Sequence, residues 1–451
     1  MNHKSRTRKP LLMAALNMAI ATPVWANSEI DELRQELAAQ KALIQQLINA
    51  QKTQQLDQSQ SPQGVPYTVP KTAIEAPPAK DPNKIITFYG VADVGIHNTD
   101  SGMGNKWTAG TGGWMASRFG INVEKNLTPD LKAVAVAEAG VHYGTGSAGA
   151  APVTPGINNG YPSSTAATSG GSQLFGRQIY AGISSASYGS LTLGRQYSGT
   201  FVLNGISNSL GFGGYGYAGS LQPANGIPSR VNNSLVYISP SISGFSSHLL
   251  FSTGSENNTN RDVEIAPGSP IKTNDKAGRG FDIEMHYSNG PLLVGASTWS
   301  FYNTTFTTGE TGLAKRTGVQ LGGAYDFGPV KFFGNYMRAK IDGNGYEDIT
   351  QAFSKTSTYS LSALVPFGKH KIYVSYTDFD DQSNLNRDAK MYGLGYSYQA
   401  DDTTKYYFSV GRMNNSANAS FSLADGGSLV GTVTTPGKSV NGIMAGVAMG
   451  F

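Results

Sequence analysis

The sequence predicts an all-β fold, a sixteen-stranded antiparallel transmembrane β-barrel preceded by a short α-helical coiled coil. Three observations predict it. The chain opens with a secretory leader, it is rich in glycine (56) and tyrosine (23), and its second part consists of short alternating segments. Weak alternation in segments of about ten residues is typical of membrane barrels. The chain has no cysteine, so disulfides do not stabilise it.

Residues 1–26 are expected to be a signal peptide. Four basic residues precede an apolar run over 11–22, and Val24 and Ala26 supply a cleavage pattern. The run is too short to cross roughly 30 Å of hydrocarbon, which argues against a membrane anchor. Without the leader, the 34 Lys+Arg fall by four and balance the 30 Asp+Glu. The mature chain therefore gives no reason to expect nucleic acid as a partner.

Residues 27–56 are predicted to form a coiled-coil helix, which Ser28 can cap. So short a helix is marginal in water, so self-association is the physical reason to expect it to be ordered. A disordered glutamine-rich tail is the alternative, because Gln40 occupies a core position of the heptad. The apolar seam at the a and d positions consists of Ile30, Leu33, Leu37, Ile44 and Leu47.

Residues 57–84 form a predicted linker between the helix and the barrel. Six prolines fall in this stretch, with little apolar surface. Prolines at this density exclude a helix and favour extended, semi-rigid chain.

Residues 85–451 are predicted to be one porous β-barrel domain. Short turns alternate along the chain with long polar connections, as in barrels with tight periplasmic turns on one rim and external loops on the other. The longest connections are 144–172, 199–229, 255–278, 341–354 and 414–437. The sixteen predicted strands are 85–97, 115–126, 131–143, 173–184, 191–198, 230–239, 245–254, 279–288, 292–302, 315–327, 330–340, 355–366, 370–380, 388–399, 404–413 and 438–451.

The alternation predicts an apolar outer face and a polar lumen. In 281–287, four apolar residues alternate with Asp282, Glu284 and His286, which we interpret as solvated wall residues. A soluble sandwich would show the same alternation, because it too buries one face of each strand. The leader, the absence of cysteine and the aromatic strand ends favour the barrel.

Several motifs in the barrel resemble a known family. They are Phe88–Gly95, Ser117–Gly120, Leu131–Ala133, Phe175–Ile183, Leu191–Tyr197 and Arg230–Pro240. These segments resemble the neisserial and burkholderial branch of the Gram-negative general diffusion porins, most densely over 86–240. The resemblance implies a homotrimer in the outer membrane, with the third external loop folded inward as a constriction. The terminal Phe451 is similar to the family's assembly signal.

The extension before the barrel departs from these porins and resembles DcaP-type and sucrose porins. It would lie in the periplasm, with peptidoglycan as one candidate partner. Outer-membrane lipid and lipopolysaccharide are expected to surround the barrel itself.

The connection over 199–229 holds no charged residue and occupies the place of the family's constriction loop. Gly211 stands where enterobacterial relatives carry a glutamate. Phe212 and Tyr215 come shortly after it and are expected at the constriction. An aromatic track that stacks sugar rings is the alternative use of this segment.

Four arginines match or adjoin the family's basic cluster opposite that loop: Arg118, Arg177, Arg230 and, close by, Arg195. Glu138 matches a neighbouring acid. Arginine stays charged and binds carboxylates and phosphates through a planar fork. Strict alternation places Arg177 with the outward-facing Ile179, so either a bulge intervenes at Gly176 or the strand lies at a subunit interface. Salt bridges at the rim are the alternative for each arginine.

The expected function is passive diffusion of small hydrophilic solutes, with anions preferred. No catalytic residue, metal or cofactor is expected, because the histidines lack metal-ligand spacing and no local triad motif is present. Two alternatives stay open. One is a sugar-selective channel, and the other is an adhesin or cell-wall tether in which the coiled coil carries the function.

Overall fold

The computed structural model describes residues 86–100, 104–144, 146–149, 174–221, 227, 229–254, 278–307, 310–342, 354–424, 429–430 and 435–451. All of them belong to one structural unit of the chain, residues 63–451. The predicted signal peptide, coiled coil and linker lie outside the described residues.

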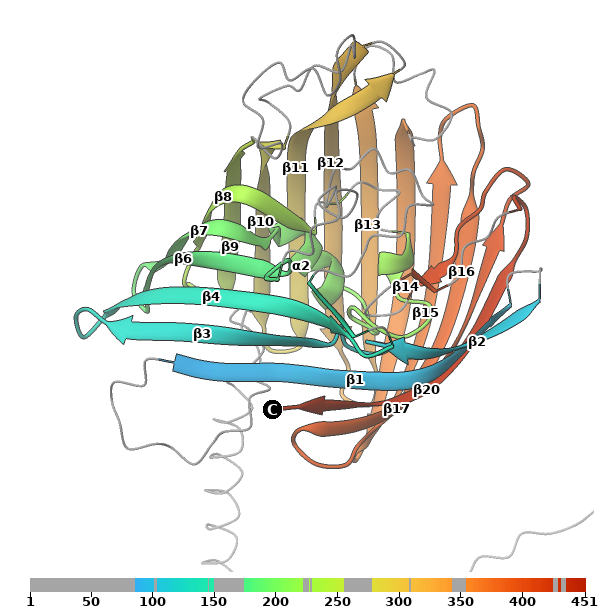
Figure 1. Cartoon of the computed structure of the whole chain (residues 1–451), viewed down its shortest axis with the longest axis horizontal. Coiled ribbons are helices and arrows are strands. Elements are labelled where there is room, and N and C mark those ends of the chain that lie inside the picture. The colour runs from blue at the N-terminus through green and yellow to red at the C-terminus, as the bar shows by residue number, and fades with distance from the viewer. Residues whose placement is uncertain are drawn as a thin grey trace, which may run out of the picture. The chain divides into compact units, whose positions relative to one another are not determined.

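Sixteen long strands close into an antiparallel barrel, which confirms the predicted fold (Figure 1). Each pairs with the next along the chain, and β1 pairs with β20 from Val91 opposite Gly450 to Asp100 opposite Asn441. The strands are β1 (Ile86–Asp100), β3 (Arg118–Asn126), β4 (Leu131–His142), β6 (Gln178–Ser185), β7 (Gly189–Tyr197), β8 (Arg230–Ile238), β9 (Phe245–Thr253), β10 (Arg279–Asn289), β11 (Leu292–Thr307), β12 (Glu310–Asp326), β13 (Lys331–Asp342), β14 (Lys355–Phe367), β15 (His370–Asp381), β16 (Ala389–Gln399), β17 (Thr404–Asn415) and β20 (Val440–Gly450).

The described parts of the connections contain four shorter strands and two helices. The strands are β2 (Asn105–Thr111), β5 (Ser147–Gly149), β18 (Leu423–Ala424) and β19 (Leu429–Val430). The helices are α2 (Gly199–Ile206) and the 3₁₀ turn η2 (Ala218–Ser220). One predicted connection is wrong: residues 303–307 and 310–314 extend β11 and β12 as a paired ribbon instead of forming a loop. Among the described residues, no helix has the length and apolar character needed to span a bilayer.

Aspartate carboxylates hold two of the short turns. In the β3–β4 turn, Asp130 accepts hydrogen bonds from the Ser185 and Ser187 hydroxyls of the neighbouring β6–β7 turn, and these bonds lower the pKa of Asp130. In the β16–β17 turn, the Thr403 backbone and hydroxyl and the Thr404 backbone N–H lower the pKa of Asp401. Asp401 therefore holds its own turn, whereas Asp130 joins two neighbouring turns.

The outer face of the barrel is apolar, as the alternation predicts. On β10, Phe281, Ile283 and Met285 are exposed, whereas the intervening polar side chains are buried. Leu361 on β14 is 65% exposed, and many large apolar side chains around the barrel are similarly open. A continuous apolar outer surface suits lipid, not water.

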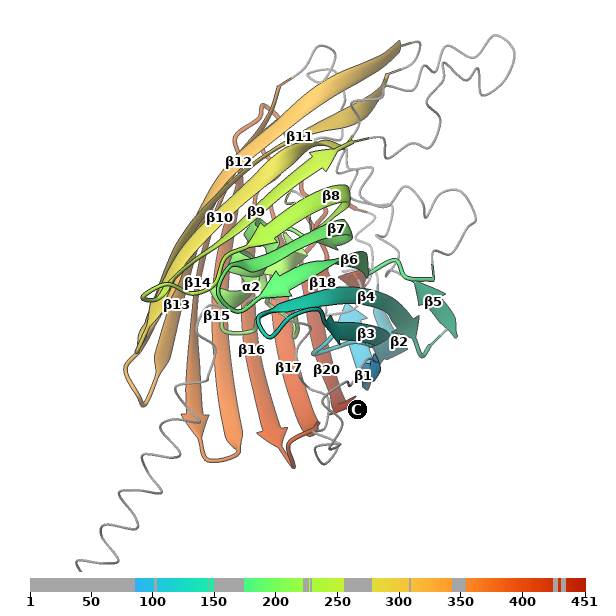
Figure 2. The same ribbon diagram turned by 90° about the vertical axis from the view of Figure 1, so that its left-hand side faces the viewer.

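The inner face is less polar than predicted. Large apolar side chains fill one side of the interior, next to β15–β20, including Trp114, Tyr215, Tyr407 and Met444. The reason is visible in Figure 2, where the segment that contains α2 lies inside the barrel wall. Wall residues that contact this segment face protein instead of water, so they bury apolar surface.

Candidate functional site

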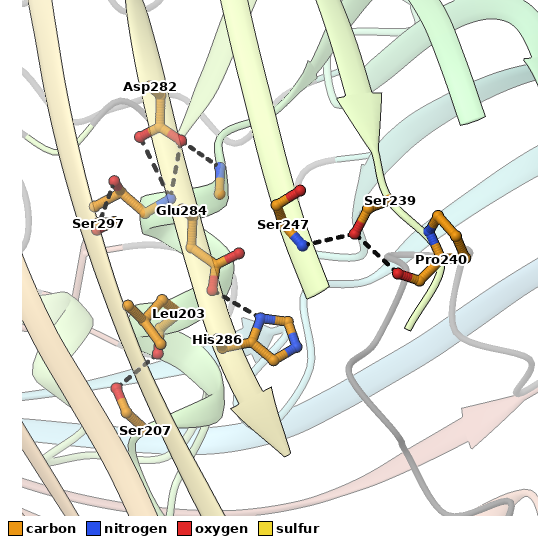
Figure 3. Close-up of polar contacts among 11 residues, drawn as sticks. Leu203, Ser207, Ser239, Pro240, Ser247, Asp282, Glu284, His286 and Ser297 are labelled. Carbon is orange, nitrogen blue, oxygen red and sulfur yellow. Dashed lines mark hydrogen bonds and ion pairs between the residues drawn. The ribbon is translucent and has the colours of Figure 1, made fainter. Parts of the chain in front are cut away.

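The segment after β7 enters the barrel through α2, which the wall holds by its first turn. Ser198 caps the helix by accepting a hydrogen bond from Phe201 N at 3.1 Å. The Asp282 carboxylate on β10 accepts bonds from the backbone N–H groups of Gly199 at 2.8 Å and Thr200 at 3.2 Å (Figure 3). A helix N-terminus carries unsatisfied N–H groups and partial positive charge, which a carboxylate neutralises. Asp282 therefore anchors the helix.

The sequence interpretation of Asp282 and Glu284 as solvated wall residues is wrong. They are 0% and 2% exposed. Glu284 Oε1 lies 2.8 Å from His286 Nδ1 (Figure 3). On the neighbouring strand β9, His248 is opposite Glu284. Within the described part of the chain, no group of three or more acidic or histidine side chains could hold a metal ion. The side chains of Asp282, Glu284 and His286 on β10 and His248 on β9 belong to the part of the wall that α2 contacts, and they support this helix.

The same segment is held at its far end by small residues of the opposite wall. Ser209 N donates to Ser362 Oγ at 2.9 Å, and Tyr215 N donates to Ser409 Oγ at 2.9 Å. Ser375 Oγ donates to the Gly216 carbonyl at 2.7 Å. Residues 199–221 thus reach from β10 to the β14–β17 wall and confirm the inward-folded third loop.

Two arginines pair with one acid on the inner wall, and a third joins them through a tyrosine. Arg177 Nε lies 2.7 Å from Glu138 Oε1, and Arg118 Nε lies 3.5 Å from Glu138 Oε2. The Tyr197 hydroxyl accepts bonds from Arg177 Nη2 at 2.6 Å and Arg230 Nη2 at 2.9 Å. We call Arg118, Glu138, Arg177, Tyr197 and Arg230 the arginine cluster. Its three guanidinium groups and one carboxylate leave two positive charges in excess.

Local backbone geometry explains how Arg177 reaches this cluster. Regular pairing of β6 begins one residue later, with Gln178 opposite Glu138. Arg177 is a bend residue whose N–H donates to the Glu138 carbonyl at 3.2 Å. Both Arg177 and Gln178 are buried. Arg177 lies before the first regularly paired residue of β6, so the alternation of inner and outer faces does not apply to it. The irregularity lies at Arg177 itself and not at Gly176.

Arg195 does not join the cluster. It lies opposite Ile179, which is exposed on the outer face of β6. Its guanidinium donates to the Gly176 carbonyl at 2.8 Å and to Asn232 Oδ1 at 2.5 Å. A register shift between Gly194 and Gln196 separates it from the end of the strand, so Tyr197 turns inward while Arg195 stays outside.

The aromatic residues of the loop have different positions. Phe212 is half-buried and stacks on Phe201 at 4.4 Å between centroids, and Phe201 stacks on Tyr197 of the arginine cluster at 5.1 Å. Tyr215 is 0% exposed and packs against the wall. Gly211 has φ +61°, and a Cβ atom there would meet no heavy atom within 4 Å. Gly211, at the position of the family's glutamate, therefore has free space beside it.

The chain end closes the barrel. Phe451 exchanges backbone hydrogen bonds with Gly90 at 2.9 and 3.1 Å, and its ring lies against Gly90. The ring is 51% exposed, in line with the apolar outer row of β20. The position fits the predicted assembly signal, whose role remains a prediction.

Known proteins share both the sequence pattern and the fold. Two solved structures superpose on 81% of this chain and 99% of their own: an anion-selective porin from Comamonas acidovorans (TM-score 0.61, 21% identity) and the trimer form of OmpT from Vibrio cholerae (TM-score 0.55, 15% identity). An outer membrane porin protein of Bordetella pertussis is 26% identical over 364 residues, which cover 71% of this chain and 87% of that protein. A family model described as Gram-negative porin matches residues 79–418. The chain therefore belongs to the Gram-negative porin family and is an outer-membrane channel.

Proposed function

We propose that this porin is a passive homotrimeric channel for small hydrophilic solutes and that it favours anions. The arginine cluster carries the proposal, because it has excess positive charge and contacts, through the stacking of Tyr197 on Phe201, a loop segment, 199–229, that has no charged residue. Fixed charges at the narrowest part of a pore act at close range on a partly desolvated ion. Arginine keeps its charge at any working pH.

Nearby acids of the inner wall are occupied by donors of the protein. Asp93 accepts bonds from Trp114 N at 2.9 Å and Met115 N at 2.6 Å. Asp282 is committed to the first turn of α2. On the same wall, Lys405 adds a positive charge above the Trp114 ring, 5.9 Å from its centroid. These contacts weaken the pull of the acids on passing cations.

The relatives support the proposal by name only. The solved porin with the TM-score of 0.61 is named anion-selective, and OmpT was solved in a trimer form. At 21% and 15% identity, their likeness to this chain is one of fold. The proposals for selectivity and assembly therefore rest on this chain's own residues, and experiments must test them.

The sugar-selective alternative loses part of its basis. A stacking track needs aromatic faces open to the solute, and the fully buried Tyr215 has none. The tether or adhesin alternative concerns the N-terminal extension, which lies outside the described residues.

The test is the zero-current potential of a planar bilayer under a potassium chloride gradient. We expect the wild-type sign to show preference for chloride. Arg118→Ala combined with Arg230→Ala should shift the potential toward cations, because the excess charge is removed. Arg195→Ala is the matched control and should leave the potential unchanged, since Arg195 lies outside the cluster. A cation-selective wild-type channel contradicts the proposal.

A further inference from the structure

Asp93 on β1 holds the segment of chain that connects β2 to β3, residues 112–117. The Asp93 side chain is buried, and its Oδ2 atom accepts hydrogen bonds from the backbone N–H groups of Trp114 at 2.9 Å and Met115 at 2.6 Å. The hydroxyl of Tyr407 on β17 donates to Asp93 Oδ1 at 2.6 Å. One buried carboxylate therefore ties this segment to the opposite neighbour of β1 in the wall, the β17–β20 side.

The backbone of Asp93 fixes the far end of the same segment. Asp93 N donates to Ser117 Oγ at 2.9 Å, and Ser117 Oγ donates to the Asp93 carbonyl at 2.8 Å. The next residue is Arg118, whose Nη1 donates to the Ala116 carbonyl at 2.9 Å. The arginine side chain is thus held against the segment that carries it, so a shift of segment 112–117 moves the Arg118 guanidinium within the arginine cluster.

The segment also contacts the inward-folded loop. Gly214 N donates to the Gly113 carbonyl at 2.8 Å. The backbone of Trp114 lies so close to Gly213 that a Cβ atom on this glycine would collide with it. Because the segment contacts both the loop and the start of β3, its position determines how far Arg118 lies from the loop.

We infer that Asp93 is a positioning residue for ion selectivity, because it holds segment 112–117 and thereby places Arg118 relative to the inward-folded loop. The inference rests on the proposed function, since it concerns the same arginine cluster. An acid that faced the solute would attract cations, so its removal would favour anions. A buried acid that acts through the position of Arg118 has the opposite effect, and its removal weakens the preference for anions.

The test measures the zero-current potential of two variants of the full-length porin that remove the same charge. Asp93→Ala removes the three hydrogen bonds of the carboxylate. Asp93→Asn can keep them, because an amide oxygen accepts from two N–H groups and the amide nitrogen donates to the tyrosine hydroxyl. We expect the ratio of chloride to potassium permeability to fall about twofold or more in the alanine variant, and to stay close to the wild-type ratio in the asparagine variant.

Two further variants separate position from charge. Ser117→Ala changes no charge and removes the hydroxyl that fixes the segment next to Arg118, so the ratio should fall, but by less than in Asp93→Ala. Glu124→Gln is the control for charge, because the Glu124 side chain alternates with Arg118 on the inner face of β3 and is 43% exposed. This variant should raise the ratio.

Each outcome bears on the inference. An equal rise of the ratio in Asp93→Ala and Asp93→Asn overturns it, because both variants then act through charge alone, and so does an unchanged ratio in Asp93→Ala. If Asp93→Ala forms no channels, Ser117→Ala decides: a lower ratio supports the inference, and a ratio at or above that of the wild type overturns it. A cation-selective wild type contradicts the proposed function, whereas the difference between the alanine and asparagine variants tests Asp93 whatever that sign is.

Discussion

The two sides of the barrel interior differ in how they treat the inward-folded loop. Next to β3–β8, the wall presents the arginine cluster and leaves two positive charges in excess. Next to β15–β20, the wall presents aromatic and methionine side chains that bury Leu210 and Tyr215 of the loop. The β15–β20 side holds the far part of the loop by apolar packing, and the β3–β8 side carries the excess positive charge.

The difference between the two sides suggests how an inward-folded loop can be held inside a pore. Apolar packing inside the barrel stabilises the loop without adding fixed charge to it. The charged side then acts on solutes across the remaining space. If the comparison is right, substitutions on the apolar side change stability and conductance, whereas substitutions on the charged side change selectivity.

The largest effect is expected from Tyr215→Ala. Removing a fully buried aromatic side chain costs about 3–5 kcal/mol of unfolding free energy. The loop should loosen, so single-channel conductance should rise and become noisier. Urea unfolding in lipid vesicles and planar-bilayer recordings measure these two effects.

Tyr392→Ala is the control for this substitution. It removes the same side chain from the outer face of β16, where the ring is 44% exposed. It should leave the conductance unchanged. A Tyr215→Ala channel as quiet and as stable as the wild type would show that the apolar side does not hold the loop.

A smaller effect is expected from Asp282→Ala, which removes the carboxylate from the first turn of α2. Loss of a helix cap costs about 0.5–2 kcal/mol. The free energy of unfolding should fall by about that amount, with more frequent conductance fluctuations. Asp282→Asn keeps one acceptor oxygen and should lose less. The anchor assignment fails if the alanine variant unfolds at the wild-type urea concentration.

Much of this architecture could be predicted from the sequence, because successive side chains of a strand point to opposite faces and polar and apolar residues therefore alternate along the chain. The sixteen strands agree with that pattern. The grouping of Arg118, Arg177 and Arg230 agrees with the family resemblance, whereas strict alternation places Arg177 on the outer face.

Arg195 follows the alternation of β7 and shares the outer face with Leu191 and Leu193. The inward position of Tyr197 could not be predicted, because it depends on a register shift of one residue between Gly194 and Gln196. The hydrogen bond from Gly199 to Asp282 joins residues 83 apart, and no local pattern reports it.

The role of the coiled-coil seam and of Phe451 stays a prediction. The helical seam lies outside the described residues, so its self-association depends on the heptad pattern alone. Tyr215 shows why composition misleads in the loop: an aromatic residue in a glycine-rich segment can face either the solute or the wall, and only the tertiary packing decides.

Gly211→Asp tests the comparison by adding an acid to the loop, directly before Phe212, which stacks on Phe201 beside Tyr197 of the arginine cluster. Because the position is open and has φ +61°, a conformation that aspartate and asparagine tolerate best among larger residues, the side chain should fit at a cost of about 1 kcal/mol. The zero-current potential should shift toward cations. Gly211→Asn carries the same backbone cost without charge, so equal potentials for the two variants would contradict the proposed electrostatic role.

The smallest effect on the pore is expected from deleting residues 28–84, because no predicted strand or loop of the pore includes them. Conductance and selectivity should stay at wild-type values. Trimer stability should fall modestly, because a trimeric barrel would tether three helices and raise their local concentration. Leu37→Pro should reproduce that loss by breaking the helix. Leu33→Cys should crosslink between subunits under oxidant. If it stays reduced in intact trimers while a cysteine pair engineered between neighbouring barrels oxidises, the extension is a disordered tail and the seam does not form.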